Sequence, residues 1–465
     1  METREVHDTM GTMTVPADAY WGAQTARARE NFPISGLGPH PEFVRALAAI
    51  KLAAARVNGS LGLLPRERSD AIAQAAQEIY EGKLREQFVV DVFNAGAGTS
   101  MHMNANEVIA SRASEILGGS RGDTGRVHPN DHVNLGQSTN DVIPTAIRLA
   151  GLVLSQRLAD AAEDLAAAFD RKAAEFDGVV KSGRTHLQDA VPIRLGQEFH
   201  AWGSAMRACA RTIRHASDGL RELGIGGSAA GTGLNNHPDS RRRIVAELAS
   251  LYGTELRPAE DLFEAMQSHR PAVEASGAAR ALACELIRIT NDLRLLSSGP
   301  RTGLAEVVLP AVQPGSSIMP GKVNPVIAEV TAMVAFHAIG CDVTITMAAQ
   351  AGQLELNVMM PVIAFDLLFA LDTLARAVTN LRERCVEGIT ANEERCRAYA
   401  EDSVAIATIL NPVIGYERAA AIVKEAVASG RSIRETLEAS GLLSREQIAE
   451  VFDLRRWTEP GLLKP

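Results

Sequence analysis

The sequence predicts a mainly α-helical protein of several domains. Its 465 residues exceed what one ordinary hydrophobic core holds, so two or three domains are expected. Hydrophobic residues make up 46% of the chain but aromatic residues only 4%, so small and aliphatic side chains supply the apolar mass. Such side chains suit close packing of helix on helix. Long stretches with almost no helix-breaking residue in the middle of the chain complete the prediction, because proline ends or kinks a helix.

Residues 1–138 mix short helical pieces with many turns, and we expect them to form an N-terminal, mostly helical domain. Residues 45–57 and 65–81 predict amphipathic helices. The second has Pro65 at its start, where the missing N–H costs nothing. Residues 12–20 predict a short strand.

Residues 139–391 predict a central bundle of five long helices. The expected spans are about 144–176, 195–223, 271–297, 325–351 and 361–381. We expect the first to begin at Pro144, because proline is favoured at a helix start. The last carries apolar residues at steps of mostly three and four, which is a helical stripe. Its second apolar side comprises Ala364, Phe365, Leu368 and Ala377. Helices that are apolar on more than one side indicate burial against copies of the chain, and a homotetramer is the leading expectation.

Residues 392–465 predict a small helical C-terminal domain. Its helices are expected to be short because Asn411-Pro412, Ser429-Gly430 and Glu459-Pro460-Gly461 interrupt the apolar pattern. The sequence shows no internal repeat and no low-complexity tract.

Charge and cysteine content exclude several classes of partner. Lys and Arg total 47 against 56 Asp and Glu, a net charge of −9, which argues against nucleic acid and against an anionic membrane surface. No run approaches 18 apolar residues, and the first residues are charged, so neither a membrane span nor a signal peptide is expected. The five cysteines are widely spaced and form no C-x-x-C pair, as expected for thiols in a reducing compartment. We therefore expect a cytoplasmic protein.

The most informative stretch is Gln-Pro-Gly-Ser-Ser-Ile-Met-Pro-Gly-Lys-Val-Asn-Pro at residues 313–325. It contains the hydroxyls of Ser316 and Ser317, the cation of Lys322 and the amide of Asn324. Its prolines and glycines exclude helix and strand, so a loop is expected. A loop rich in reactive side chains between two helices is typical of an active-site lid. The alternative is a polar linker.

Three further segments share this composition of hydroxyls, amides and few cations beside glycine. The set comprises residues 98–104, 136–141, 183–189 and 315–324. Neutral donors at helix ends can hold two carboxylates tightly without a metal, so no metal and no cofactor is expected. Taken singly, Ser138, Thr139 and Thr185 have the alternative interpretation of helix caps.

The run His128-Pro129-Asn130-Asp131-His132 has the residue types of a metal cluster. Pro129 and Asn130 indicate a turn, however, and no H-E-x-x-H or similar helical spacing follows. We therefore expect no metal site here.

All four segments, GSSIMPGKVNP above all, resemble the signature motifs of the aspartase/fumarase superfamily, and the similarity covers nearly the whole chain. The resemblance implies a three-domain subunit with a long central five-helix bundle. It also implies a homotetramer with a 20-helix core, whose active sites are shared between subunits. The expected substrate is a small dicarboxylate. For residues 128–132 it implies a second anion site or a subunit contact.

The resemblance also implies residue roles. The residues implied to act in catalysis are Ser316 as the base, His186 beside the leaving group, and Glu329, which orients His186. The residues implied to bind the substrate are Thr99, Ser138, Thr139, Asn140, Thr185, Lys322 and Asn324.

Members of the family differ in the group that leaves. Residues 138–141 and 352–359 resemble the ammonia-eliminating members, whereas residues 8–25 resemble class II fumarases. The expected reaction is the reversible deamination of L-aspartate to fumarate and ammonia. The alternatives are fumarate hydration, elimination of a less familiar amine, and a structural role without catalysis. The departures beside the expected site are His102 in place of Asn, Gly136 in place of Ser, and Met360 in place of the Glu of many ammonia-eliminating members.

Overall fold

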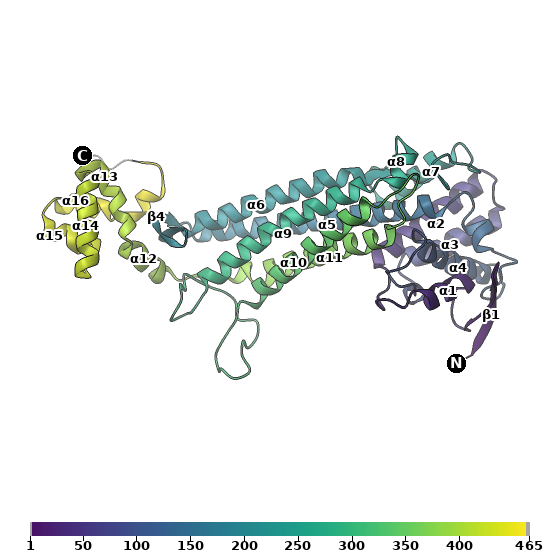
Figure 1. The fold of residues 1–465 in the computed structure, drawn as a ribbon, viewed down its shortest axis with the longest axis horizontal. Coiled ribbons are helices and arrows are strands. Elements are labelled where there is room, and N and C mark those ends of the chain that lie inside the picture. The colour runs from purple at the N-terminus through teal and green to yellow at the C-terminus, as the bar shows by residue number, and fades with distance from the viewer. Residues whose placement is uncertain (1, 462–465) are drawn as a thin grey trace. The chain divides into compact units, whose positions relative to one another are not determined.

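The structure is a computed structural model that describes residues 2–461, and it is mainly helical (Figure 1). This confirms the predicted fold class. Within the described range, five helices of 22 to 37 residues are the longest elements. They are α5 (Thr139–Glu175), α6 (Leu195–Ala216), α9 (Arg270–Leu296), α10 (Val326–Ala349) and α11 (Met360–Arg384). The spans of α9, α10 and α11 lie within a few residues of those expected, whereas α6 ends at Ala216 and not near residue 223.

The chain divides into two compact units by its internal contacts. Unit 1 consists of Met1–Asp160, Ala210–Ala283 and Val334–Ala375, and unit 2 consists of Ala161–Cys209, Cys284–Met333 and Arg376–Pro465. Every boundary between them falls inside one of the five long helices, so each unit contains a part of all five. The three-domain division at residues 138 and 391 stays a prediction.

Unit 1 begins with an antiparallel hairpin of β1 (Thr3–Asp8) and β2 (Gly11–Pro16). Strand β2 corresponds to the strand predicted at 12–20 but ends at Pro16. The helices α1 (Ala23–Asn31), α2 (Pro41–Ser60), α3 (Arg66–Tyr80) and α4 (Thr99–Ile116) follow. The core between α2, α3 and α4 is mainly apolar and includes Leu47, Ile50, Ile72 and Ile109, but it also buries polar side chains of α2 and α4. The two amphipathic helices predicted here are confirmed as α2 and α3. The short elements of the unit are η1 (Arg85–Gln87), η2 (Pro129–Val133), η3 (Ser217–Arg221), β5 (Glu222–Leu223), α7 (Ser240–Tyr252), β6 (Arg257–Pro258) and α8 (Leu262–Gln267).

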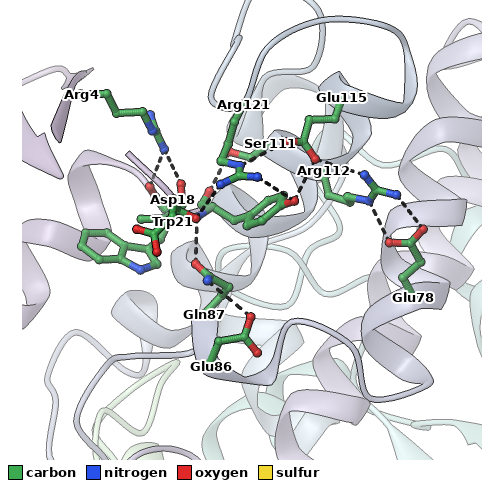
Figure 2. A network of polar contacts seen from close by, with 12 residues as sticks. Arg4, Asp18, Trp21, Glu78, Glu86, Gln87, Ser111, Arg112, Glu115 and Arg121 are labelled. Carbon is green, nitrogen blue, oxygen red and sulfur yellow. Dashed lines mark hydrogen bonds and ion pairs between the residues drawn. The ribbon is translucent and has the colours of Figure 1, made fainter. Parts of the chain in front are cut away.

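A polar network attaches the chain's beginning to α3 and α4 (Figure 2). The Arg121 guanidinium lies 4.0 Å above the Tyr20 ring, and the Tyr20 hydroxyl donates to Glu115 of α4 at 2.9 Å. Arg112, also on α4, forms a two-bond ion pair with Glu78 of α3 at 2.8 and 3.0 Å. Because these bonds join residues up to 101 positions apart, they fix the N-terminal segment on the helices.

Helix α5 begins at Thr139, five residues before the predicted start at Pro144, which lies inside the helix. The sequence prediction of this boundary is therefore wrong. Pro144 has no N–H, so the carbonyl of Asn140 lacks its usual i+4 amide partner. The helix nevertheless extends upstream because Ser138 and Asp141 stabilise its first turn through hydrogen bonds that a proline-based rule does not see.

Unit 2 contains the antiparallel hairpin of β3 (Val180–Thr185) and β4 (Gln188–Arg194). Beside it, Phe169 of α5 packs edge-on against Phe199 and Trp202 of α6 at centroid distances of 6.0 and 5.7 Å. Gly196 of α6 permits this approach, because a Cβ there would lie 2.4 Å from the Ala173 carbonyl oxygen. The hairpin therefore stands at the base of two closely packed helices.

The rest of unit 2 is built from short elements, as predicted for the C-terminal region. They are β7 (Val307–Val308), η4 (Val386–Gly388), β8 (Thr390–Ala391), α12 (Glu393–Asp402), η5 (Val404–Leu410), α13 (Asn411–Ile414), α14 (Tyr416–Ser429), α15 (Ile433–Ser440), α16 (Arg445–Val451) and η6 (Leu454–Thr458). A buried cluster that includes Ile406, Leu410, Leu437 and Val451 holds the last helices together.

Among the described residues, α10 exposes more large apolar side chains than α11, on which Phe369 is 37% exposed. The second apolar side of α11, on which the tetramer prediction depended, is covered within the chain: Leu368 is buried, and Phe365 packs against Phe93 at 5.6 Å. Helix α10 instead exposes an apolar stripe at spacings of three, four and seven, with 40–63% of each residue's surface accessible. The stripe, here called the α10 face, comprises Val330, Met333, Phe336, Val343 and Met347.

Two described helices, α5 and α10, are long and apolar enough to cross a membrane by length and composition alone. The sequence prediction did not identify them, because it considered only uninterrupted apolar runs. The apolar window of α5 is 83% buried inside the chain, as in a core helix, whereas that of α10 is 39% buried. One or two such helices are weak support for a membrane span, because core helices pass the same test.

Candidate functional site

Residues 138–140 form the first turn of α5 and are held there by Asp141. Its carboxylate accepts hydrogen bonds from the backbone amides of Ser138 (2.9 Å), Gly226 (3.0 Å) and Ser228 (2.9 Å). Burial raises the pKa of Asp141 to about 6, because the loss of hydration outweighs the three amide bonds. One carboxyl group thus fixes both the helix start and the segment that faces it.

The side chains of Ser138 and Asn140 are both engaged. The Ser138 Oγ accepts a 3.3 Å hydrogen bond from the Asn140 amide, which is a helix-cap interaction. The Asn140 Nδ2 donates to the Ala229 carbonyl at 2.8 Å. The capping interpretation therefore applies to Ser138, and capping does not exclude a further contact, because a hydroxyl also has a proton to donate.

Thr139 contacts a buried polar pair that the sequence did not reveal. Its Oγ1 lies 2.9 Å from Nδ1 of His102 on α4. The Nε2 of the same ring lies 2.7 Å from Nζ of Lys51 on α2. His102 and Lys51 are 1% and 0% exposed, and burial lowers both pKa values well below their ordinary range. The charge of Lys51 lowers the pKa of His102 further.

Gly136 is explained by its surroundings. Its backbone is left-handed, with φ at +72°, and a Cβ on it would lie 2.5 Å from the Asn236 Oδ1. The Asn236 Nδ2 donates to the Gly226 carbonyl at 3.2 Å, so this amide cannot easily move away. Glycine is therefore required at position 136 as long as asparagine stands at 236.

Thr99 is the first residue of α4 and lies in the same unit. Its exposed hydroxyl donates to the Gly96 carbonyl at 2.6 Å. The chain enters α4 through left-handed Gly98, so backbone amides of the first helical turn are presented beside Thr99. Donors at a helix N-terminus are suited to an anion.

Thr185 and His186 lie at the tip of the β3–β4 hairpin in unit 2. Thr185 pairs with Gln188, so His186 and Leu187 form a two-residue turn with φ at +56° and +58°. Left-handed backbone at both central positions favours Asn and Gly, and a His-Leu pair is strained there. The turn presents both Thr185 and His186 to solvent.

A buried charge cluster supports this hairpin. Lys181 of β3 contacts Glu306 at 2.9 Å, and Arg184 near the end of the same strand donates to Glu306 at 2.9 and 3.0 Å. Glu306 is 0% exposed and Lys181 is 1% exposed. Because Glu306 precedes the loop that begins after β7, the cluster attaches the hairpin to the root of that loop.

The loop of residues 309–325 is a closed turn in this structure. The Ser316 Oγ accepts hydrogen bonds from the backbone amides of Ile318 (3.2 Å) and Met319 (3.0 Å). The two ends of the turn meet where the Gly315 amide donates to the Lys322 carbonyl at 2.7 Å. The side chain of Asn324 donates to the Gly315 carbonyl, also at 2.7 Å. The predicted loop is therefore confirmed as a loop, with Lys322 exposed at its surface.

The predicted site residues fall into two groups. Unit 1 contains Thr99, Ser138, Thr139 and Asn140. Unit 2 contains Thr185, His186, Ser316, Lys322, Asn324 and Glu329. In unit 1 the turns of α4 and α5 meet through the contact of His102 with Thr139. In unit 2 a backbone turn joins Ser316 to Asn324, but among the described residues no hydrogen bond or ion pair within the chain joins Glu329 to His186.

Sequence reasoning missed Lys51, Asp141 and Glu306 as parts of the site's support. A signal existed for Lys51: Leu47, Lys51, Ala54 and Asn58 recur at helical spacing, which places a lysine on the buried stripe of α2. Asp141 was visible as an acid in the first turn of α5, where a carboxylate is favoured. No local pattern indicated that Glu306 pairs with Lys181.

No group of three or more His, Cys, Asp or Glu side chains among residues 2–461 is arranged to hold a metal ion. The run 128–132 forms the π-helical turn η2, and the His128 ring accepts from the amides of Asn130 and Asp131. One wall of a cavity of about 450 Å³ includes His128, Asn130 and Arg4.

Comparisons with known proteins show the family to which the chain is similar. A lyase family model matches residues 11–340, and a model of the fumarase C C-terminus matches residues 406–459. An aspartate ammonia-lyase of a Bacillus species is 46% identical and covers 99% of this chain and 98% of its own length. A class II fumarate hydratase of Halobacterium salinarum is 49% identical, with 99% and 98% covered.

Among solved structures, a fumarate lyase:delta crystallin from Brucella melitensis bound to cobalt is 50% identical and superposes with a TM-score of 0.95. That match covers 99% of this chain and 100% of the other. Sequence motifs, helical architecture and full-length similarity lead to one conclusion: the chain belongs to the lyase family of the aspartase/fumarase superfamily.

Proposed function

We propose that the chain is an aspartate ammonia-lyase that converts L-aspartate reversibly to fumarate and ammonia. The observation that carries this proposal is the full-length similarity to several relatives of that name. The local structure of the Ser316 loop supports the type of chemistry, because a hydroxyl oxygen that accepts two backbone amides is suited to carry negative charge.

In the proposed reaction, the Ser316 alkoxide takes a proton from the carbon next to one carboxylate. The electron pair of that C–H bond moves into the carboxylate, which becomes a dianionic enediolate. The pair then forms the carbon–carbon double bond, and the C–N bond breaks with its electrons on the nitrogen. The products are fumarate and ammonia.

The enediolate needs stabilisation that the ground state does not receive. Thr99, Ser138 and Thr139 are proposed to donate to it from the starts of α4 and α5. By analogy with oxyanion holes, one such donor contributes about 2.7–4 kcal/mol, so several donors provide a large share of the barrier reduction. Exclusion of water from the site in the proposed assembly would strengthen each bond, because the local dielectric would then be low.

The remaining candidates are proposed to hold the other parts of the substrate. Lys322 and Asn324 bind the second carboxylate, and Asn140, Thr185 and His186 surround the leaving amine. Glu329 orients His186. These residues come from different segments of the chain, and the proposed assembly of subunits is what brings them together.

The proposed assembly is a homotetramer of three-domain subunits, whose five-helix bundles form a common 20-helix core with shared active sites. The α10 face supports an assembly, because an exposed apolar stripe along a 24-residue helix is unfavourable in water. We propose a cytoplasmic location, where reducing conditions keep the five cysteines as the free thiols seen here. The proposed partners include neither nucleic acid nor membrane.

Fumarate hydratase is the second candidate, favoured by the 49% identity to a class II enzyme of that name. Incubation with fumarate separates the two reactions, because the loss of fumarate absorbance can be followed with and without ammonium. Consumption only in the presence of ammonium, with L-aspartate formed, supports the proposal. Consumption in amine-free buffer, with L-malate formed, would overturn it in favour of hydration.

A further inference from the structure

The inference begins with the hydrogen bonds of Lys51. Its Nζ contacts three acceptors: Nε2 of His102 at 2.7 Å, Oδ1 of Asn134 at 3.0 Å and Oε1 of Gln137 at 2.9 Å. The orientation of both amides is set independently, because Asn134 Nδ2 donates to the Gln137 carbonyl and Gln137 Nε2 donates to the Val133 carbonyl, each at 3.1 Å. An ammonium group has three N–H donors and no acceptor. All three donors of Lys51 are therefore used, one on each partner.

This arrangement determines the tautomer of His102. Its Nε2 accepts a hydrogen bond from Lys51, so in the neutral ring Nδ1 is the nitrogen that carries hydrogen. The neutral form is favoured because the ring is buried beside a cation. Nδ1 lies 2.9 Å from Thr139 Oγ1 and donates to it. The Thr139 hydroxyl thus accepts from His102, and its own proton remains for another acceptor.

We propose that Lys51 and His102 position the Thr139 hydroxyl as a hydrogen-bond donor to a substrate carboxylate. This role rests on the proposed function, in which Thr139 holds a carboxylate. Neither Lys51 nor His102 touches the substrate, so both are positioning residues that act through Thr139.

Loss of a proton from Lys51 would prevent the Thr139 hydroxyl from donating to the substrate. When Lys51 loses a proton, its Nζ lone pair accepts from His102 Nε2–H, and Nδ1 becomes an acceptor that takes the Thr139 O–H. A single proton removed from Lys51 therefore withdraws the hydroxyl from the substrate. The ionisable group facing the pair from α5 is Asp141, whose charge raises the pKa of Lys51, and Asn134 and Gln137 add only uncharged amides.

The test is a double-mutant cycle between His102 and Thr139, read as affinity for succinate, an unreactive C4 dicarboxylate, by titration calorimetry on the assembled protein. His102→Leu and Thr139→Val should each weaken succinate binding about tenfold, the loss expected for a hydrogen bond to a charged group. The double variant should lose little more than either single variant, because both remove the same donor. Independent, multiplicative losses would overturn the proposal.

Two controls separate positioning from damage to the fold. His102→Asn keeps a donor near the position of Nδ1, so it should recover most of the affinity lost in His102→Leu. His269→Leu removes another fully buried histidine of unit 1, and it should lower the thermal midpoint while leaving succinate affinity intact. If His102→Asn binds as poorly as His102→Leu, the donor is not the property that matters and the proposal fails.

A pH profile tests the proton arrangement. Wild-type affinity for succinate should fall as alkaline pH removes the Lys51 proton, below the ordinary pKa of lysine, and Thr139→Val should show no such fall. An equal alkaline fall in both would overturn the switch. The mutant cycle measures binding and not turnover, so its result can be told apart from a failure of the proposed reaction. Absence of turnover with both L-aspartate and fumarate would remove the proposed function, whereas absence of succinate binding by the wild type would remove this inference.

Discussion

Ser316 is the proposed base of the reaction, although its free chemistry is poorly suited to that role. A serine hydroxyl is a weak base at neutral pH, and the loop provides two backbone amides to its oxygen. Amide donors stabilise an alkoxide without contributing a titrating group of their own. The loop therefore provides a local means of stabilising the Ser316 alkoxide.

Ser316→Ala should lower kcat by several orders of magnitude while the affinity for succinate changes little, because the variant loses the base but no carboxylate contact. The measurement is fumarate absorbance with saturating L-aspartate, together with titration of succinate. Ser317→Ala is the matched control, since Ser317 is the exposed neighbour in the same loop. Near-normal turnover in Ser316→Ala, or its loss in Ser317→Ala, would contradict the assignment of the base.

Asp141 predicts a pH dependence of stability. Its pKa is raised from 3.8 to about 6 in the folded protein, so the folded state binds this proton more tightly than the unfolded state. Its contribution to stability is therefore fully present below pH 3.8 and is lost as pH rises through 6. At 1.36 kcal/mol per pKa unit, the change is on the order of 3 kcal/mol.

Urea unfolding of the wild type and of Asp141→Asn at pH 4 to 7 measures this contribution. The unfolding free energy of the wild type relative to Asp141→Asn should fall as pH rises towards 6 and become constant above that pH. A difference that does not vary with pH would show that Asp141 does not titrate there.

At the scale of elements, the part of the candidate site in unit 2 depends on how the β3–β4 hairpin is attached to the start of the Ser316 loop. The β3–β4 turn uses left-handed backbone at His186 and Leu187, which a free hairpin of this sequence would not favour. The buried contacts of Lys181 and Arg184 with Glu306 hold the strand that carries this turn. Strain at the tip is thus maintained by ion pairs at the base.

Lys181→Met should destabilise the protein by about 3 kcal/mol, because it removes a partner from the fully buried Glu306 carboxylate. Lys181→Met combined with Glu306→Leu should recover only part of this loss, because it removes the fully buried carboxylate but leaves Glu198 without Lys181 and Arg184 without Glu306. Thermal and urea unfolding provide the measurement. Arg66→Ala is the control: its pair with Asp70 is exposed on both sides, so less than about 1 kcal/mol should change. A loss in Lys181→Met as small as in Arg66→Ala would contradict this account.

At the scale of the whole molecule, the single chain leaves the apolar residues of the α10 face exposed. Met333 and Phe336 are 63% and 59% exposed in the middle of an apolar helix. Copies of the chain are the proposed cover, because an interface core requires such apolar surface.

Phe336→Asp should dissociate the assembly and abolish activity, because a carboxylate placed in an apolar interface loses its hydration without gaining a partner. Sedimentation velocity gives the mass, and fumarate formation gives the activity. Val427→Asp changes an equally exposed residue of α14, and it should preserve both mass and activity. Unchanged sedimentation of Phe336→Asp would remove the α10 face from the proposed interface.

Much of the fold could be predicted because helices depend on local pattern. The apolar period and the positions of Pro325 and Pro361 located α10 and α11 to within a few residues. The start of α5 could not be located in the same way, because Ser138 and Asp141 stabilise it against the signal of Pro144. Local rules fail where side chains provide bonds that outweigh propensity.

The sequence alone determined the helical class and the donors available for catalysis, since each motif is a short contiguous segment whose residue types limit its chemistry. Only the tertiary structure revealed the contacts that support those donors: His102 and Lys51 next to Thr139, and Glu306 paired with Lys181 of the hairpin. It also showed that the α10 face is exposed in the single chain. The supporting contacts join residues from 37 positions apart, His102 and Thr139, to 125 positions apart, Lys181 and Glu306. Local periodicity extends over a few turns, so it cannot specify which distant side chains meet in the interior.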